Sequence, residues 1–191
     1  MKYETIRKQV LEAILDAVEQ GLIKGTSGNI AMRDETEDVV AITPSGIPYK
    51  GMQPEDIAIV DLNGKWLDGN YKPSSEVPMH TAVMRARPDV RATVHTHGMF
   101  ATIMAMGEGE LLPVTPPQCE FAPGAKKFPF TMPGSNEVAE RVVGSTGKGR
   151  TFCSYEKSWN VLLRQRYEGS HGGNHLYRRN GYNCILCKRP R

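Results

Sequence analysis

The sequence predicts an α/β or α+β domain around a mainly antiparallel sheet. Its short apolar segments are separated by turn residues, and Asn63-Gly64 between two of them is the strongest hairpin signal in the chain. Segments with apolar residues three and four positions apart, typical of amphipathic helices, come between these short segments. No internal repeat is present. This mixture of hairpins and helices indicates one layered domain.

The length and composition agree with a single domain. The chain has 191 residues, of which 39% are hydrophobic and 24% are charged. No apolar run approaches the roughly 18 residues that a membrane span needs, and the first residues do not form a secretory leader. Four cysteines without a disulfide pattern are typical of a reducing compartment. We therefore expect a cytoplasmic protein with no membrane partner.

The first half of the chain is expected to contain one long helix and four strands. In the helix at Glu4–Gln20 the apolar residues share one face and Gly21 ends the helix. These apolar residues are Ile6, Val10, Leu11, Ile14, Leu15 and Val18. Alternation and turn residues predict strands at residues 30–33, 38–43, 57–62 and 66–67.

In the second half, a helix at residues 76–87 is ended by Pro88, and residues 90–97 alternate as a strand. Further along we expect a helix at 98–106, a strand at 111–114 and a helix at 135–143 with Ser135 or Asn136 as its cap. From residue 152 to the end, neither a helical nor a strand period is evident.

His95-Thr96-His97 is the sharpest local signal for chemistry. Residues two apart on a strand point to the same face, so both imidazoles can bind one ion. The alternative is a pair of surface or core histidines that happen to lie two positions apart. For the pair considered alone, the metal site and this alternative have about equal weight. Glu76 opens the preceding helix, and its carboxylate could reach the same ion or act as a base beside it.

Three turns of small residues offer hydroxyls and backbone amides: Thr26–Asn29, Thr43–Gly46 and Pro73–Ser75. Ser74 and Ser75 also lie at a helix N-terminus, where unpaired amides favour an anion. Each turn alone is more often an ordinary turn or cap. Together with a metal pair, they suggest a site for a phosphorylated substrate.

These motifs together resemble the class II aldolase/adducin family. The matching segments are Gly25–Asn29, Thr43–Tyr49, Pro73–Glu76 with His80, and Arg87–Val90 leading to His95-Thr96-His97. The resemblance runs in order from about Met1 to Gly149 and is strongest to the family's L-fuculose 1-phosphate type of aldolase. It implies a three-layer α/β/α domain and a homotetramer with active sites between neighbouring subunits.

The resemblance also implies a role for each matching residue. Glu76 would be the catalytic acid/base, and His95, His97 and Glu76 would contact one Zn²⁺ per subunit. Gly28, Asn29, Ser45, Gly46, Ser74 and Ser75 would hold the substrate phosphate. His80, one turn after Glu76, is expected to be structural.

The implied reaction is the zinc-dependent aldol cleavage of a ketose 1-phosphate to dihydroxyacetone phosphate and a short aldehyde. A sugar-phosphate 4-epimerase or a dehydratase on the same scaffold is the alternative, although the family's epimerases usually have Asp where this chain has Glu76. A metal-free, adducin-like binding module is a further alternative, against which the presence of both histidines argues.

The third zinc ligand of the family, a histidine in an Asn-His-Gly or His-His-Gly motif, is not present in this chain. The corresponding tract reads Ser154–Val161. This tract can be written with codons that its amino acids permit. When these codons are read in the frame that begins one nucleotide later, they give Val-Met-Lys-Asn-His-Gly-Met. The glycine is forced by Trp159-Asn160, and the recovered histidine straddles the codons of Ser158 and Trp159. We interpret the chain after about Arg150–Cys153 as translated out of frame.

Charge supports this interpretation. Residues 1–149 have a net charge of −4, whereas residues 150–191 have +7. We therefore expect an incomplete aldolase-like domain at residues 1–150 and a basic, unpatterned tail at 151–191, with the family's last strand and helix disrupted. Solubility and activity should be impaired. An arginine-rich tail that binds RNA or a membrane is the less favoured hypothesis, so we expect no nucleic-acid partner.

Overall fold

The computed structural model describes residues 1–34, 36–98, 103, 106, 126–146, 152–155, 160–164, 178–179 and 182–183. The predicted strand at 111–114 and most of the predicted helix at 98–106 lie outside the described residues. Within the described ranges, no helix is both long enough and apolar enough to cross a membrane.

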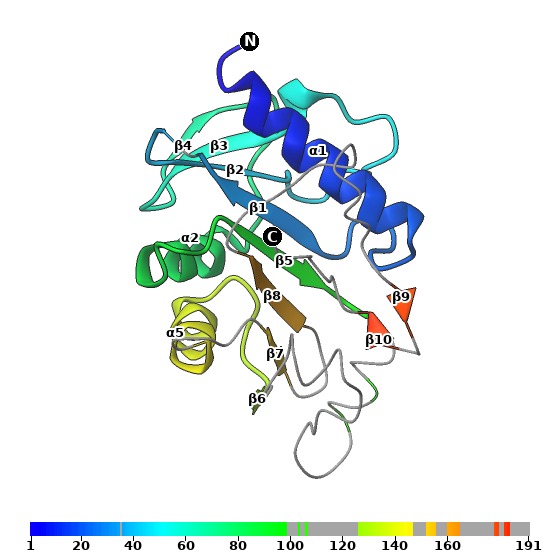
Figure 1. The fold of residues 1–191 in the computed structure, drawn as a ribbon, viewed down its shortest axis with the longest axis vertical. Helices are drawn as coiled ribbons and strands as arrows, with labels where there is room; N and C mark the ends of the chain where they lie inside the picture. Colours follow the sequence, from blue (N-terminus) through cyan, green and yellow to red (C-terminus); the bar gives the residue numbers. More distant parts are fainter. Residues whose placement is uncertain are drawn as a thin grey trace, which may run out of the picture.

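Eight of the described strands form one large sheet with the order β4-β3-β2-β1-β5-β8-β7-β6 (Figure 1). Neighbouring strands are antiparallel except for β6 and β7, which are parallel. The bounds are β1 Asn29–Arg33, β2 Val39–Ile42, β3 Ala58–Asp61, β4 Trp66–Asp68, β5 Ala92–Thr96, β6 Lys126–Phe128, β7 Phe152–Tyr155 and β8 Asn160–Arg164. The predicted mainly antiparallel sheet is confirmed.

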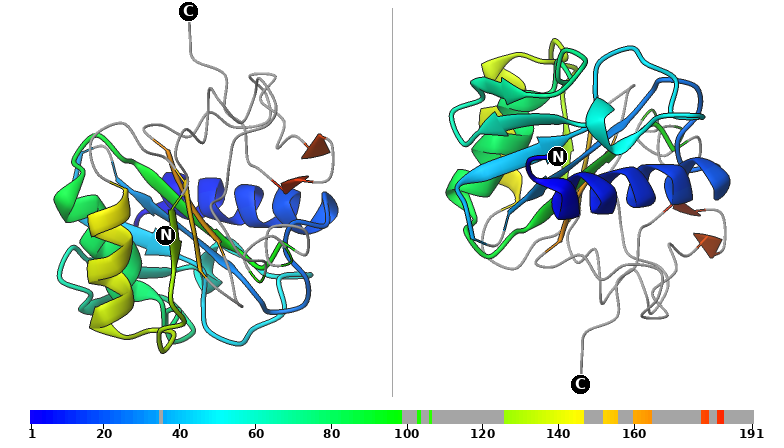
Figure 2. Two further views of the ribbon diagram at one scale, coloured as in Figure 1. Left: turned by 90° about the horizontal axis from the view of Figure 1, so that it is seen from below. Right: turned by 90° about the horizontal axis from the view of Figure 1, so that it is seen from above.

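Helices α1, α2 and α5 of the described residues cover the two faces of this sheet (Figure 2). Helix α1 spans Glu4–Glu19 and lies on one face, and α2 (Val77–Ala86) and α5 (Asn136–Ser145) lie on the other. The Ser135 side chain accepts a hydrogen bond from the Val138 amide and so caps α5. The expected three-layer α/β/α arrangement is confirmed.

Alternation along the strands divides the core into two layers. Ile30 and Met32 of β1 pack with α1, whereas Ala31 packs with Val77 and Met84 of α2. A third cluster joins α2 to α5. Because β1 and β5 are central and covered on both sides, side chains at their ends are fixed by the packing of both helical layers.

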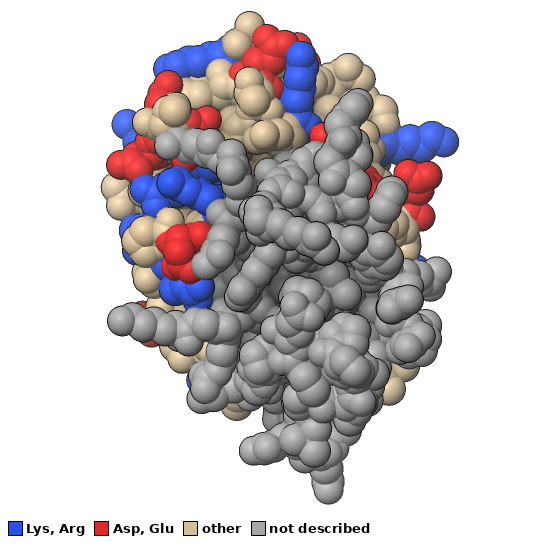
Figure 3. Space-filling view, in the orientation of Figure 1, with Lys and Arg blue, Asp and Glu red and all other residues tan. Residues whose placement is uncertain are grey.

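The surface of the described residues has mixed charge. In the view of Figure 3, lysines and arginines are interspersed with aspartates and glutamates along the upper and side edges of the molecule. One cation is buried instead: Arg7 of α1 is 1% exposed.

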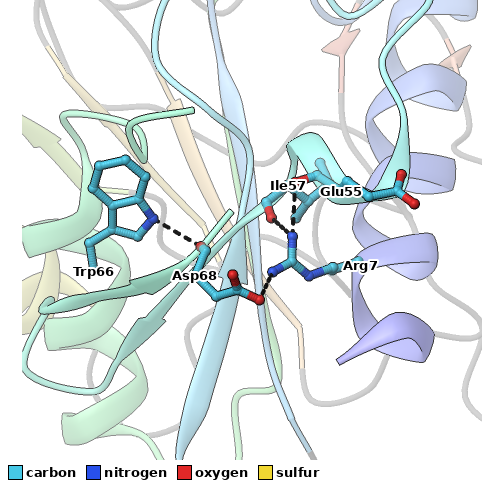
Figure 4. A network of polar contacts seen from close by, with 5 residues as sticks. All are labelled: Arg7, Glu55, Ile57, Trp66 and Asp68. Atoms are coloured by element: carbon cyan, nitrogen blue, oxygen red, sulfur yellow. Dashed lines mark hydrogen bonds and ion pairs between the residues drawn. The ribbon is translucent and has the colours of Figure 1, made fainter. Parts of the chain in front are cut away.

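Arg7 joins α1 to the edge of the sheet (Figure 4). Its guanidinium donates to the carbonyl oxygens of Glu55 (3.0 Å) and Ile57 (2.5 Å) and to the Asp68 carboxylate (2.6 Å). Glu55 lies in the 3₁₀ helix η1, Pro54–Asp56, and Asp68 ends β4. The network therefore ties the first helix to the predicted hairpin.

Short strands lie among the described residues of the tail that the sequence predicts to be unpatterned. Residues 152–155 and 160–164 form β7 and β8, and β8 pairs with β5 so that Val161 lies opposite His95. Strand pairing uses backbone groups, so it does not need the side-chain alternation that the sequence lacks here. A short pair, β9 (Arg178–Arg179) with β10 (Tyr182–Asn183), lies further along. The predicted boundary at residue 150 thus precedes two strands of the main sheet.

Candidate metal and substrate site

The two histidines of the His-x-His motif lie together at the end of β5. Their Nε2 atoms are 3.1 Å apart, and their rings are stacked with centroids 4.9 Å apart and an angle of 28° between planes. Two nitrogens that bind one tetrahedral ion at 2.0–2.1 Å are about 3.3 Å apart. The spacing of this pair therefore fits two ligands of one zinc ion.

Burial keeps both imidazoles uncharged, as metal binding requires. His95 is 3% exposed, and its burial, together with nearby His97 and His80, shifts its pKa well below the ordinary value. Desolvation also lowers the pKa of His97. At neutral pH each ring is uncharged, so each has one nitrogen lone pair to offer to a cation.

Glu76 places a carboxylate at the start of α2. The residue is 4% exposed, and its Oε2 atom is buried with no hydrogen-bond partner among the described residues. Burial raises the pKa of the carboxyl group, and a hydrogen bond from the Gly134 backbone opposes this shift. An unpartnered buried carboxylate oxygen costs free energy, which is typical of a group that acts on a ligand.

A metal centre with three protein ligands is not formed by the described residues. Among them, no group of three or more His, Cys, Asp or Glu side chains could hold a metal ion. The structure thus brings His95 and His97 together, and the share of Glu76 in metal binding stays a prediction.

Two of the three small-residue turns lie side by side and meet the start of β1. The Ser45 amide donates to the Lys72 carbonyl (2.9 Å), and the Ser74 amide donates to the Thr43 carbonyl (3.1 Å). Thr43 also makes two hydrogen bonds with Ile30. The Thr43 amide donates to the Ile30 carbonyl oxygen (3.1 Å), and the Ile30 amide donates to the Thr43 hydroxyl oxygen (3.2 Å). Thr43 therefore connects the turns that the sequence analysis considered separately.

The predicted phosphate residues differ in what their side chains can do. Ser45, Gly46 and Ser75 are exposed, so their hydroxyl or amide groups are accessible. The Ser74 hydroxyl is buried and accepts a hydrogen bond from the Glu76 amide at 3.2 Å. Asn29 is also buried, and its amide contacts two histidines.

Gly28 is required by the geometry around His95. Its φ is +94°, and a Cβ at this position would lie 2.7 Å from the His95 carbonyl oxygen. The Gly28 carbonyl accepts a hydrogen bond from the buried Tyr49 hydroxyl at 2.5 Å. The backbone here thus packs directly against the histidine strand.

Three neighbours of the site were not among the predicted site residues. Thr93 contacts His80, Gly134 contacts both Glu76 and the Ser75 backbone, and Tyr49 holds Gly28. Strand alternation places Thr93 on the same face as His95, two residues before it, but no role was assigned to it. Tyr49 ends the matching segment Thr43–Tyr49, whereas Gly134 comes from a distant loop to which no local pattern points.

A separate cavity of about 860 Å³ lies between α2, α5 and the β3–β4 turn. Its described lining includes Ser74 and Ser75 and neither histidine of the pair. The chemistry suggested by the imidazoles therefore lies outside this cavity.

The fold and the histidine pair define a three-layer α/β/α domain with a candidate metal centre at the end of a central strand. The chain belongs to the class II aldolase and adducin family, because the model of the Class II Aldolase and Adducin N-terminal domain matches residues 8–164.

Similar proteins include named aldolases. A 5-deoxy-D-ribulose 1-phosphate aldolase of Bacillus thuringiensis serovar kurstaki is 35% identical over 134 residues, which are 70% of this chain and 63% of that protein. This chain thus spans less than two thirds of that relative.

Solved structures show the same fold. An L-fuculose 1-phosphate aldolase superposes with a TM-score of 0.80 and 26% identity, over 87% of this chain and 78% of the other. The L-fuculose-1-phosphate aldolase of Thermus thermophilus superposes with a TM-score of 0.71 and 25% identity, over 87% of this chain and 80% of the other.

Proposed function

We propose that this chain derives from a zinc-dependent aldolase that cleaves a ketose 1-phosphate, of the L-fuculose 1-phosphate type, into dihydroxyacetone phosphate and a short aldehyde. The observation that supports this most is the 3.1 Å approach of His95 Nε2 and His97 Nε2 on a fold whose relatives include aldolases of two sugar 1-phosphates. The protein would act as a cytoplasmic homotetramer.

His95 and His97 would hold the zinc ion, which when bound stabilises the negative charge that develops as the carbon–carbon bond breaks. Glu76 would move a proton to or from the carbon of the dihydroxyacetone phosphate half. Its burial raises its pKa towards neutrality, which suits an acid/base group. Gly28, Asn29, Ser45, Gly46, Ser74 and Ser75 would position the phosphate, the exposed ones by direct contact.

Activity of this chain should be impaired because the third histidine is missing. Pairing of β8 with β5 places Asn160 opposite Thr96 and Val161 opposite His95. The last two residues of the tract in which the family has its third ligand therefore lie beside the histidine strand, and the tract contains no histidine. Loss of one of three strong ligands should weaken zinc binding severely.

One observation favours a second function, a metal-free binding module. Over the described part of the chain, no three potential ligands converge. Zinc content distinguishes the two functions, because the binding module would purify without the metal and would not take it up. A 4-epimerase or dehydratase would differ from the aldolase only in its products.

The test compares this chain with a version whose reading frame is moved by one nucleotide after Arg150. With zinc and a ketose 1-phosphate, we expect little or no turnover by the first and release of dihydroxyacetone phosphate by the second. Glu76→Gln in the second should lower kcat by at least about 100-fold, whereas Glu19→Gln on the exposed part of α1 should not. A zinc-loaded, folded second version that releases no dihydroxyacetone phosphate would overturn the proposal.

A further inference from the structure

A chain of buried polar groups runs from α2 to the histidine pair. Asn29 begins β1 and lies opposite His95 of β5 in the register of the two strands. His80 of α2 packs over this face of the sheet, with its Nε2 atom 2.5 Å from Asn29 Oδ1 and its Nδ1 atom on the Thr93 hydroxyl. The Asn29 Nδ2 atom lies 3.5 Å from His95 Nδ1.

Burial fixes the protonation of this chain of groups. His80 is fully buried, and desolvation lowers its pKa to about 3, so the ring is neutral and has a single N–H. With the amide oxygen of Asn29 towards His80, the ring donates from Nε2 and accepts from the Thr93 hydroxyl at Nδ1. The amide nitrogen then donates to His95 Nδ1, so the proton of neutral His95 is on Nε2, facing His97.

The same positions allow a second complete arrangement. An amide keeps its shape when its oxygen and nitrogen exchange places. The oxygen of Asn29 then accepts from His95 Nδ1–H, its nitrogen donates to His80 Nε2, and His80 donates from Nδ1 to Thr93. His95 now presents its Nε2 lone pair towards His97, and every group in the chain still has its partner.

We infer that Asn29 and His80 are positioning residues that set the tautomer of His95. In the metal-free protein they keep the proton of His95 on Nε2. When a metal binds, they let Nε2 present its lone pair to the metal. The part of the inference that concerns zinc binding rests on the proposed function, whereas the part that concerns the tautomer of His95 does not. His80 touches neither substrate nor metal and acts through Asn29. Its role would resemble the hydrogen-bond partners that orient metal-binding histidines in other proteins.

The experiment uses the full chain and three variants. His80→Leu removes both hydrogen bonds, and His80→Gln keeps an amide that can bond to Asn29. Met84→Ala, at a buried α2 position outside the chain of polar groups, controls for lost stability. The first readout is the imidazole ¹⁵N spectrum of the metal-free protein, which reports the tautomer of His95. The second is the zinc dissociation constant by chelator competition.

In the metal-free parent and in Met84→Ala, we expect His95 to have a single tautomer with its proton on Nε2. His80→Leu should show a mixture of both tautomers and bind zinc about 10- to 100-fold more weakly. His80→Gln should fall between, and Met84→Ala should keep the parent affinity.

Identical His95 spectra in His80→Leu and the parent, with both folded by circular dichroism, would overturn the inference. Equal weakening by Met84→Ala would do the same, because it would show a loss of stability rather than of positioning. If neither the parent nor its frame-restored version binds zinc, the proposed function fails, and the ¹⁵N spectra alone decide the inference.

Discussion

Gly28 precedes β1 at a φ of +94°, and a Cβ there would meet the His95 carbonyl oxygen at 2.7 Å. Gly28→Ala should therefore lower the free energy of unfolding by about 2–4 kcal/mol, because backbone strain and a backbone clash act together. Gly25→Ala is the matched control, since Gly25 has a φ of +58° and no atom within 4 Å of its Cβ position. It should cost only about 1–2 kcal/mol. Equal losses in urea unfolding would contradict the close packing.

Stability should fall in acid because His80 is buried without charge. Its pKa is about 3 in the folded protein and about 6.5 in an unfolded chain. Between these values only the unfolded chain takes up the proton, so the free energy of unfolding falls as the pH drops from about 6.5 towards 3. Above pH 6.5 this contribution is fully present.

The variant His80→Gln isolates this contribution. The pKa of His95 is also lowered by burial, but His95 is present in both the parent and the variant, so its effect on stability cancels in the comparison. The slope of unfolding free energy against pH between about 4 and 6 should decrease by about 1.4 kcal/mol per pH unit. Denaturant melts at several pH values measure the slope. An unchanged slope would show that His80 takes up its proton in the folded protein.

At the scale of residues, the sequence predicted what depends on neighbours along the chain. Alternation alone placed His95 and His97 on one side, and the structure confirms that their rings meet. The contacts of Asn29 with His80 and His95 depend on the register of β1 with β5 and on the packing of α2. Neither register nor helix packing is encoded in a local pattern, so the network could not be predicted.

At the scale of elements, Arg7 makes α1 depend on the β3–β4 hairpin. Arg7→Met keeps the aliphatic stem but leaves two carbonyl oxygens and the Asp68 carboxylate without the guanidinium. We expect a loss of about 2–4 kcal/mol, lower than for a fully buried pair because the Asp68 side chain is 49% exposed. Thermal or urea unfolding measures it.

Asp68→Asn provides the comparison, because it removes one charge and keeps the carbonyl contacts of Arg7. It should cost at most about 1 kcal/mol. If the two variants lose the same stability, the carbonyl contacts contribute nothing.

Elements with a strong period were predicted well. The helix expected at Glu4–Gln20 is observed at Glu4–Glu19, although Leu15, placed on the apolar face, is 39% exposed. Arg7 lies on the buried side of the helix instead. A pattern of apolar residues cannot predict the burial of a charged side chain. Strands β7 and β8 were missed because their pairing depends on backbone groups of distant residues.

At the scale of the whole molecule, the charge of the chain is divided near residue 150, from −4 before it to +7 after it. Our proposed shift of reading frame explains this division together with the missing histidine. Sequencing the encoding DNA should show that one nucleotide, inserted or removed near Arg150, restores Asn-His-Gly. Codons for Ser154–Val161 that cannot yield this motif in another frame would contradict the explanation.

The central claim is that His95 and His97 bind one divalent ion. Titration of the metal-free chain with Co²⁺, followed by its visible absorption, tests this most directly, with His95→Ala and His97→Ala as variants. The account predicts one weakly bound ion per chain, with nitrogen ligands, and loss of that binding in both variants. Binding that is unchanged in either variant, or no binding at millimolar metal by the intact chain and its frame-restored version, would contradict it.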